Sequence, residues 1–488
     1  MDTEKKISLP ELWAHQKEAI KRAQINRGFG LFFDMGTGKT RTAIEIIKRD
    51  ELIHGKQTVL IVCPLIVCSN WKREFARYAG LTEEEQEEII ILEGSIPKRI
   101  HKLEDKRYSV YITNYDAFVN DPFCANIKAR GFTSVVLDES HRIKSPTAKR
   151  TKHVLDLICA NRQIKRVLLL SGTPILASIE DLFTQIMCID DGIRLGSNFY
   201  SFKARYMCDL NAARRHRMSR YFPDWAPRPG ALEEITRQIE DITMSVAKKD
   251  CLDLPPLTKQ VIEVELTLEQ KRVYQSIKKD LLAEFGSGAV TVTPLAITKT
   301  LRLMQWCHGF MPASITEPGE APEEVVEVPK ENPRIEALKQ LLEDYTPGNK
   351  VIVWASWRAN ITEIMDLCEK LGIKAVRVDG TVTGENRERA IQAFREVSDV
   401  RVFVGHPGAG GIGITLIEAA VMIYYSRSFN LEHDMQSEAR NYRGGSEMHE
   451  KITRVDIVTK NTIDAFVVEQ LALKQSVGDS LLEAIKYE

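Results

Sequence analysis

The stretch FFDMGTGKT, residues 32–40, restricts the fold of this chain more than any other segment. It follows the apolar run 29–33 and precedes the helical pattern TRTAIEIIKR, so it lies on a strand-to-helix turn. Glycines let backbone N–H groups curl toward phosphate oxygens, while Lys39 can reach the β- and γ-phosphates and Thr40 can hold Mg²⁺. Phe33 occupies the place of the first glycine of the full pattern, but the shorter form GxGKT is intact. We therefore predict a nucleotide site in an α/β domain, against the alternative of a chance glycine turn.

Short apolar runs rich in β-branched residues recur along the chain, and each is followed by a longer helical pattern. They form two groups, which lie at residues 29–33, 58–63, 108–113, 133–138 and 166–171, and at residues 350–355, 374–379, 400–405, 421–425 and 453–458. Continuous apolar strands that alternate with helices are typical of parallel sheets covered on both faces. The sequence therefore predicts an α/β fold with two parallel-sheet domains.

The segment between the two groups has a different character. From residue 180 to residue 335 it lacks the strand rhythm and has a mostly helical pattern. It ends in an acidic, proline-rich stretch, 314–333, which is typical of an exposed linker or loop. We expect a first domain over residues 1–185, helical insertions and a linker over 186–335, and a second domain over 336–488.

The composition excludes several classes of protein. No apolar run reaches the roughly 20 residues that a membrane helix needs, and the first residues lack the apolar core of a signal peptide. The net charge is -1, so nucleic acid would have to bind through local basic patches. The nine cysteines include no CxxC pair and predict buried thiols in a reducing compartment, without disulfides or a zinc site. We expect a cytoplasmic protein with no membrane partner.

The segment DESHRIKSPTAK, residues 138–149, brings two carboxylates to the end of an apolar run. Asp138 ends a strand of the same predicted sheet as the phosphate loop, where it would bind Mg²⁺ directly or through water. The adjacent Glu139 could orient and deprotonate an attacking water. Two alternatives stay open here: a solvated acidic turn, and a zinc site with His141, for which further ligands at suitable spacing are missing.

Other motifs are weak individually and gain weight from being found together. SGTP, residues 171–174, follows a strand but is an ordinary turn as often as a site. The glycine-rich segment 406–416 can bring the backbone close to a phosphate or ribose, or simply make a tight turn. Arg440 and Arg443 are spaced to share one helical face, and arginines supplied across a cleft stabilise a transferring phosphoryl group. When such a pair of arginines stands alone, it usually lies on a solvent-exposed helical face without a catalytic role.

In this order, the motifs resemble those of superfamily 2 helicase-like motors, and within that group they look most like the Swi/Snf-type DNA translocases. The segments that carry the resemblance are LWAHQKEAI (12–20), DMGTGKT (34–40), VLIVCPLIVCSNWKREF (59–75), ITNYDAF (112–118), VVLDESHRIKS (135–145), SGTPI (171–175), VRVDGTVTGENRERAIQAF (376–394), GAGGIGITLIEA (408–419) and QSEARNYR (436–443). DESHRIK is the most specific, because the family has a DE-x-H followed closely by a lysine. The chain departs from the family in SGTPI, which LAS follows, and in QSEARNYRGGS, where the family has QAxxRxxRxGQ.

The resemblance implies two RecA-like lobes that bind ATP with Mg²⁺ in the cleft between them. Gln16 would recognise adenine, and His141 would couple the ATP site to the second lobe. The ATP-binding residues would be Gln16, Gly36, Thr37, Gly38, Lys39, Thr40 and Gly413, and the metal ligands Thr40 and Asp138. The catalytic set would be Lys39, Asp138, Glu139, Arg440 and Arg443, with the two arginines reaching from the second lobe.

The resemblance also implies contacts to the nucleic-acid backbone with little base specificity. The positions that the family pattern suggests are Asn70, Lys72, Thr113, Asn114, Ser356, Trp357 and Thr383, and an ordinary surface role is an open alternative for each. The basic and aromatic stretch 200–222 could brace duplex DNA through Arg214, Arg215 and Arg217. The alternative is an amphipathic helix whose aromatic residues are buried and whose arginines are solvated.

These expectations define one leading function and two alternatives. The leading hypothesis is a monomeric, ATP-driven motor on double-stranded DNA. It would remodel branched DNA by fork regression or branch migration, as in repair and recombination, or displace bound protein. The alternatives are a strand-separating DNA or RNA helicase, and a non-hydrolysing nucleic-acid-binding scaffold, which the intact catalytic set disfavours. A compact motor of this kind is expected in the cytoplasm of a bacterium or of a virus-infected host, or in the nucleus of a eukaryote.

Overall fold

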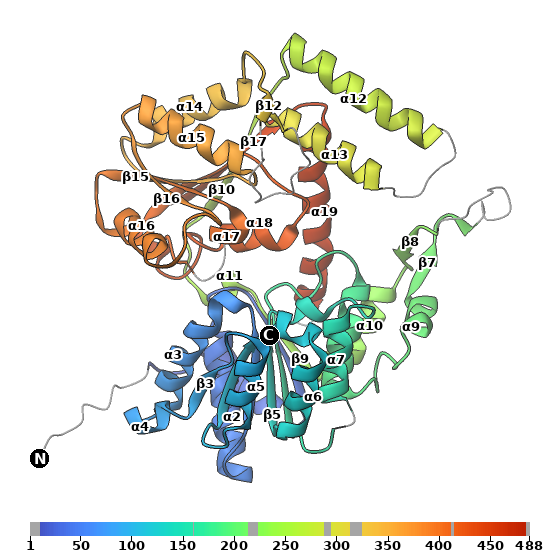
Figure 1. The fold of residues 1–488 in the computed structure, drawn as a ribbon. Helices are drawn as coiled ribbons and strands as arrows, with labels where there is room; N and C mark the ends of the chain where they lie inside the picture. The colour runs from blue at the N-terminus through green and yellow to red at the C-terminus, as the bar shows by residue number, and fades with distance from the viewer. Residues whose placement is uncertain are drawn as a thin grey trace, which may run out of the picture. The chain divides into compact units, whose positions relative to one another are not determined.

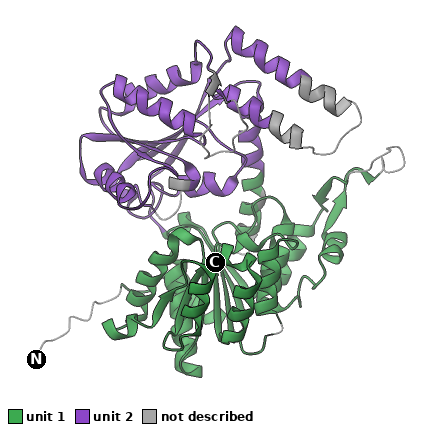
Figure 2. Ribbon diagram, in the orientation of Figure 1, with its two compact units in different colours: residues 1–251, 474–488 green, residues 252–473 purple. Residues whose placement is uncertain are grey.

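The computed structural model describes residues 10–159, 161–212, 223–286, 294–312, 325–410 and 414–484. The chain folds into two compact units, the first made of residues 1–251 and 474–488 and the second of residues 252–473 (Figure 1, Figure 2). The stretch 186–335, expected as insertions and a linker, contributes to both units. Each unit contains one large parallel sheet, as the sequence predicts.

The first unit is built on a seven-stranded sheet with the order β3-β4-β2-β5-β6-β1-β9. Its strands are β1 (Gly28–Phe33), β2 (Val59–Cys63), β3 (Ile89–Ile91), β4 (Val110–Asn114), β5 (Ser134–Asp138), β6 (Arg166–Leu170) and β9 (Thr243–Val246). All neighbouring pairs are parallel. Strands β1, β2, β4, β5 and β6 coincide with predicted apolar runs, so the parallel sheet is confirmed for this unit.

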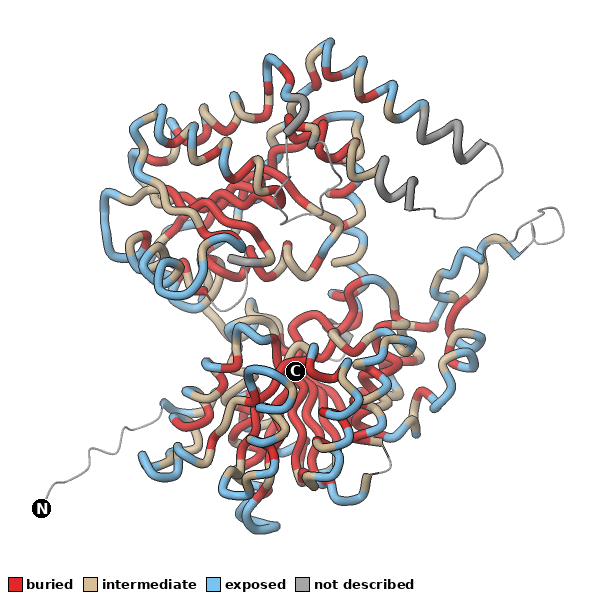
Figure 3. Tube along the Cα trace, in the orientation of Figure 1, coloured by how far each residue is buried: buried red, intermediate tan, exposed pale blue. Residues whose placement is uncertain are grey.

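Helices cover both faces of this sheet, and the strands contribute side chains to two separate hydrophobic cores. In β2, Leu60 and Val62 belong to one hydrophobic cluster, while Val59 and Ile61 belong to the other. The central strands are buried along their whole length (Figure 3), which explains why they read as continuous apolar runs. The helices are α1 (Ala14–Ala23), α2 (Lys39–His54), α3 (Cys68–Ala79), α4 (Glu83–Gln86), α5 (Ile96–Glu104), α6 (Asp121–Arg130), α7 (Lys149–Ile158), α8 (Phe183–Asp190), α9 (Phe199–Tyr206), α10 (Ala231–Ile239) and α11 (Lys248–Cys251).

The second unit is built on a six-stranded sheet with the order β10-β17-β16-β13-β15-β14. Its strands are β10 (Leu257–Val264), β13 (Lys350–Trp354), β14 (Lys374–Val378), β15 (Val400–Gly405), β16 (Ala419–Tyr424) and β17 (Ile452–Thr459), and all pairs are parallel. All but β10 match predicted runs, so the second parallel sheet is confirmed too. The helices are α12 (Leu268–Gly286), α13 (Pro294–Cys307), α14 (Pro333–Tyr345), α15 (Arg358–Lys370), α16 (Gly384–Glu396), α17 (Pro407–Gly410) and α18 (Leu431–Glu438).

The segment expected to be mostly helical also supplies a strand to each large sheet. β9 pairs with β1 at the edge of the first sheet, and β10 pairs with β17 at the edge of the second. β9 has only 4 residues, and β10 exposes most of its side chains, including Lys259 and Gln260, so neither shows a long apolar run. The segment also holds two short antiparallel pairs, β7 (Met207–Asp209) with β8 (Trp225–Pro227) and β11 (Met311–Pro312) with β12 (Val325–Glu327).

The tail forms a long helix, α19 (Ile463–Ala484), and the border between the two units falls within it (Figure 2). Its residues 474–484 belong to the first unit, where Leu481 is fully buried in one of the two cores of that unit. A Cβ atom on Gly478 would lie 3.3 Å from the carbonyl oxygen of Ile175. The helix backbone therefore runs close to the segment that follows β6, and a small residue suits that contact.

In the described parts of the chain, no helix combines the length and the apolar character needed to span a membrane. All nine cysteines lie within the described residues. None of them forms a disulfide. Six of the nine are buried, in agreement with the prediction of buried thiols.

Candidate active site

Three loops leave the first sheet at the carboxyl ends of neighbouring strands. β6 lies between β5 and β1, and the register pairs Leu170 with Asp138 on one side and with Leu31 on the other. The phosphate loop follows β1, the segment SGTP follows β6, and Glu139 follows Asp138, the last residue of β5. Because the strands are parallel, all three segments emerge at the same edge of the sheet, where α/β proteins bind ligands.

The phosphate loop surrounds the side chain of Lys39, the first residue of α2. Gly36 and Gly38 both have a φ of 87°, in the left-handed region that favours glycine. The Nζ atom of Lys39 donates to the carbonyl oxygens of Phe33 and Asp34, at 2.6 and 3.1 Å. The ammonium group and the positive N-terminal end of α2 are thus close together, a combination that attracts phosphate.

Helix α1 supports the loop through Gln16. Its Nε2 donates to the carbonyl oxygen of Gly38 at 3.3 Å, and its Oε1 accepts from the backbone N–H of Trp13 at 2.9 Å. A Cβ atom on Gly38 would lie 2.2 Å from Gln16 Nε2, so this close approach requires glycine. The residue expected to recognise adenine therefore lies directly beside the phosphate loop.

His15, which no sequence pattern marks as a site residue, supports the same loop. Its Nε2 lies 2.9 Å from the carbonyl oxygen of Thr37, and its ring lies 5.4 Å from the rings of both Trp13 and Phe33. Burial lowers the pKa of His15, although the contact with Thr37 opposes this effect. The ring is therefore neutral at neutral pH, with the proton on Nε2. Its position next to Gln16 was the one available signal.

Asp138 is held by donors from three neighbouring elements. The indole N–H of Trp71 donates to its Oδ2 at 2.8 Å, the backbone N–H of Glu139 donates to its Oδ1 at 3.1 Å, and the hydroxyl of Tyr115 donates to its carbonyl oxygen at 2.8 Å. Burial, and then the negative charge of Glu139, raise the pKa of Asp138 to about 6, while Trp71 and Lys39 act in the opposite direction. Trp71 lies within a segment that carried the family resemblance, but its role depends on a contact that the sequence does not reveal.

Glu139 has an unusual backbone conformation, with a φ of 53°. Its Oε2 is buried, accepts no hydrogen bond from the described residues, and lies 3.5 Å from Nδ1 of His141. The same nitrogen lies 3.3 Å from the hydroxyl of Ser171, which accepts from the backbone N–H of Thr173. A buried carboxylate oxygen without a donor is suited to accept a proton from water. His141 links this carboxylate to the segment SGTP within the first unit.

The oxygen donors Thr40 and Asp138 suit Mg²⁺, a hard cation that takes several ligands from phosphate and water. Among the described residues, no group of three or more His, Cys, Asp or Glu side chains could hold a metal ion. A metal here would therefore depend on nucleotide and water for its remaining ligands. This donor set does not suit a structural zinc ion, which takes four protein ligands.

In the second unit, Arg440 and Arg443 lie in the turn after α18, which ends at Glu438. The expectation that they share a helical face is therefore wrong, because the helix ends before them. Arg440 is buried, and it donates from Nε to Gln436 O at 2.8 Å and from Nη1 to Ile414 O at 3.1 Å. Arg443 Nη1 donates to the hydroxyl of Thr415 at 3.1 Å. Both arginines thus pack against the end of the glycine-rich segment, of which Gly413 lies outside the described residues.

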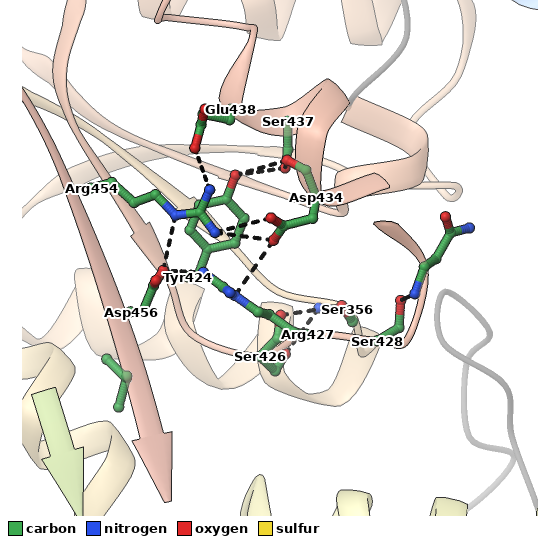
Figure 4. A network of polar contacts seen from close by, with 12 residues as sticks. Ser356, Tyr424, Ser426, Arg427, Ser428, Asp434, Ser437, Glu438, Arg454 and Asp456 are labelled. Atoms are coloured by element: carbon green, nitrogen blue, oxygen red, sulfur yellow. Dashed lines mark hydrogen bonds and ion pairs between the residues drawn. The ribbon is translucent and has the colours of Figure 1, made fainter. Parts of the chain in front are cut away.

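A buried network of charges holds α18 against β16 and β17 (Figure 4). The guanidinium carbons of Arg427 and Arg454 lie 4.4 and 4.3 Å from the centre of the Tyr424 ring. Arg454 donates to Asp434 at 3.0 Å, and Arg427 lies 3.6 Å from the same carboxylate. The charge-balancing acids are Asp434, Glu438 and Asp456. Burial alone raises the pKa of Asp434, but the two arginines outweigh it and hold the pKa below its usual range.

A second buried network joins α13, α14, α15 and α19. The indole N–H of Trp357 donates to His308 Nδ1 at 3.0 Å, and His308 Nε2 lies 3.2 Å from Asp464. Asp464 also pairs with Arg334 and accepts from the backbone N–H of Thr459 at 2.8 Å. Burial raises the pKa of Asp464, but Arg334 and His308 outweigh it and hold the pKa well below its usual range. These contacts give His308 a structural role.

The residues suggested as DNA contacts differ in their environments. Thr113, Asn114, Ser356 and Trp357 are buried within their own units, and Asn114 accepts from Arg99 at 2.8 Å. Three of the suggested positions are at least partly exposed to solvent: Asn70, Lys72 and Thr383. Arg214, Arg215 and Arg217 lie outside the described residues. All of these contacts remain predictions.

Residues 15–309 match the SNF2-related domain, over more than half of the chain. The chain belongs to the SNF2-related family. Residues 333–445 match the helicase conserved C-terminal domain. The two parallel-sheet units are the two RecA-like lobes of a Swi/Snf-type core.

Known relatives differ in how far they extend beyond this core. Chromodomain-helicase-DNA-binding protein 1-like of Mus musculus is 25% identical over 464 residues, which are 92% of this chain and 47% of that protein. The chain therefore spans about half the length of this relative. Putative protein p41 of Acyrthosiphon pisum secondary endosymbiont phage 1 is 27% identical over 483 residues, 96% of this chain and 95% of the phage protein. The solved Sulfolobus solfataricus SWI2/SNF2 ATPase core in complex with dsDNA is 21% identical, with a TM-score of 0.43 over 97% of this chain and 93% of that chain.

Proposed function

We propose that this SNF2-related chain is an ATP-driven motor that moves along double-stranded DNA and either remodels branched DNA or displaces bound protein. The observation that carries the proposal is the grouping of Lys39, Asp138 and Glu139 at the carboxyl ends of β1 and β5, the two strands that flank β6, in a chain of this family. DNA as the track is supported by the family and by relatives whose names describe DNA-binding helicases.

The proposed role of Lys39 follows from its contacts with Phe33 and Asp34. These carbonyl oxygens hold its ammonium inside the loop, and phosphate oxygens would replace them when ATP binds. The backbone N–H groups of residues 36–40 would donate to the same phosphates, while Gln16 would meet the adenine. Because α1 and the loop are already joined, the site is organised before ATP arrives.

Asp138 and Glu139 would divide the chemistry between them. Asp138, with Thr40, would hold Mg²⁺, which supplies charge neutralisation at the phosphates. Glu139 would accept the proton of the attacking water at its Oε2, which has no hydrogen-bond donor among the described residues. His141 contacts both this carboxylate and Ser171, so a change in the charge of Glu139 would alter the contact with Ser171. In the second lobe, Arg440 and Arg443 would stabilise charge on the transferring phosphoryl group.

The first test is ATP turnover at low salt with no polynucleotide, single-stranded DNA, duplex DNA, forked DNA or RNA. Glu139→Gln and Lys39→Ala serve as inactive blanks. Lys48→Ala removes a half-buried lysine further along the same helix, where it pairs with Glu45 and donates to the carbonyl oxygen of Tyr78, and is the matched control. We expect strong stimulation by duplex or forked DNA, with both blanks inactive and the control unchanged.

The other outcomes separate the alternative functions. Stimulation by single strands or RNA alone would favour a strand-separating helicase. Equal rates for the wild type and Lys39→Ala would favour a scaffold that hydrolyses nothing. Movement itself is tested by displacement of a third strand from a DNA triplex, because a motor on duplex DNA releases that strand without separating the duplex.

A further inference from the structure

Two thiols face each other beside the proposed ATP site. The sulfur atoms of Cys63 and Cys68 lie 3.5 Å apart, and both side chains are buried. Of the nine cysteines, all of which the structure describes, only these two bring sulfur atoms into contact. Cys63 ends β2 and Cys68 begins α3, and only Pro64 and the short 3-10 turn Leu65–Val67 lie between them.

The distance between these sulfurs is within reach of a disulfide bond. An S–S bond is about 2.05 Å long, so the two atoms would approach each other by about 1.5 Å. The turn between them includes Leu65 and Ile66, whose side chains are 62% and 43% exposed. A turn at the surface can adjust its backbone more easily than a buried strand.

The environment also favours reaction at Cys68. Either thiol can donate to the other, and this contact lowers the pKa of Cys68. Burial acts against it, while the positive charge of Arg99 lowers the pKa further. A lowered pKa increases the fraction of thiolate, which is the nucleophilic form. Cys68 is therefore suited to attack an oxidant, with Cys63 in position to resolve the product.

The pair is mechanically connected to the catalytic carboxylates. Trp71 lies one turn beyond Cys68 on α3, and its indole N–H holds Oδ2 of Asp138 at 2.8 Å. A bond that draws Cys68 toward the end of β2 would move the first turn of α3. Trp71 would move with that turn, and its hydrogen bond to Asp138 would be lost or lengthened.

We propose that Cys63 and Cys68 form a modification site at which hydrogen peroxide creates an intramolecular disulfide that slows ATP hydrolysis. The thiolate of Cys68 attacks one peroxide oxygen, which gives a sulfenic acid and, after protonation, water. Cys63 then attacks the sulfenic sulfur, which forms the S–S bond and releases a second water. Two thiols are oxidised and one peroxide is reduced to two waters. The effect on ATP hydrolysis rests on the proposed function, whereas formation of the disulfide does not.

The test uses the whole chain treated with hydrogen peroxide, then catalase, then iodoacetamide. Cleavage after Lys56 and Lys72 yields one tryptic peptide, residues 57–72, that contains both cysteines. We expect this peptide to lose two hydrogen atoms and to escape alkylation. ATP turnover should fall by about 10- to 150-fold, the range that corresponds to one hydrogen bond to a charged group. Dithiothreitol should restore both the alkylation and the turnover.

Matched variants separate this pair from the other cysteines. Cys63→Ala and Cys68→Ala should each retain turnover after peroxide, relative to the same variant untreated. Cys124→Ala, which changes a buried cysteine outside this region, should stay as sensitive as the wild type. A thermal melt of each untreated variant shows whether it folds. If one of the two variants, Cys63→Ala or Cys68→Ala, does not fold, the other one still tests the proposal.

Three results would overturn the proposal. The first is full alkylation of both cysteines in peptide 57–72 after peroxide treatment. The second is a disulfide that forms without any change in turnover, which would refute the coupling through Trp71. The third is equal inactivation of the Cys63→Ala and Cys68→Ala variants. If untreated wild-type protein hydrolyses no ATP, the proposed function fails, while the mass of the peptide still reports on the disulfide.

Discussion

The hydrogen bond between Trp71 and Asp138 allows a sharp test of the active site. Replacing Trp71 by Phe retains an aromatic ring in the core but removes the indole N–H that donates to Oδ2. Because this donor favours the charged carboxylate, its loss must raise the pKa of Asp138 further. The ionised form, which would hold Mg²⁺ under the proposed function, would then be reached only at higher pH.

The size of the effect follows from the strength of such a contact. A hydrogen bond to a charged group contributes about 1.5–3 kcal/mol, and one pKa unit corresponds to about 1.4 kcal/mol. The pKa of Asp138, about 6 in the wild type, should therefore rise by about 1–2 units. At neutral pH this change alone would leave half or less of the variant in the ionised form.

The assay is the pH dependence of kcat/KM for ATP, because this ratio reports ionisations of the free enzyme. The acidic limb should move from about pH 6 in the wild type to about pH 7–8 in Trp71→Phe. Tyr115→Phe is the matched control, because it removes a hydroxyl that donates to the backbone carbonyl of Asp138 and leaves the carboxylate untouched. Identical acidic limbs for the wild type and Trp71→Phe, with both folded, would refute the reasoning.

Three further predictions test other contacts. His15→Phe keeps an aromatic ring but removes the contact with Thr37, so the KM for ATP should rise about fivefold with kcat little changed, as initial rates would show. Arg454→Met leaves Asp434 buried without its main donor and should lower the free energy of unfolding by about 3–5 kcal/mol, measured by urea denaturation. The lowered pKa of Asp464 contributes stability that is present above about pH 4 and is lost as the pH falls toward the folded-state value. Asp464→Asn, although less stable at neutral pH, should therefore lose less further stability than the wild type between pH 4 and pH 2, as thermal melts would show.

The central strands could be predicted because burial on both faces requires a continuous run of apolar residues. β1, β2 and β6 are apolar at every buried position or nearly so, and their limits were predicted to within a residue or two. The edge strands do not have such a run. β3 has only 3 residues, and β10 exposes polar side chains, so neither could be distinguished from loop or helix by pattern alone.

The candidate site was predictable in its parts but not in its assembly. The GxGKT pattern after a strand marks Lys39, and the two carboxylates at the end of an apolar run mark Asp138 and Glu139. The order in which β5, β6 and β1 lie in the sheet brings them to one edge, and no local pattern contains that order. Trp71 and His15 escaped notice because their importance lies in single contacts with residues far along the chain.

The division of the first unit between both ends of the chain affects how this protein is made. Its phosphate loop and its whole sheet leave the ribosome early, but the turns of α19 that carry Leu481 are synthesised only after the entire second unit. Until then, the part of the hydrophobic core around Ile175 is not covered by α19 and is exposed to solvent. A nascent chain stalled before residue 474 would therefore carry a complete phosphate loop on an unfinished core, open to chaperones and proteases.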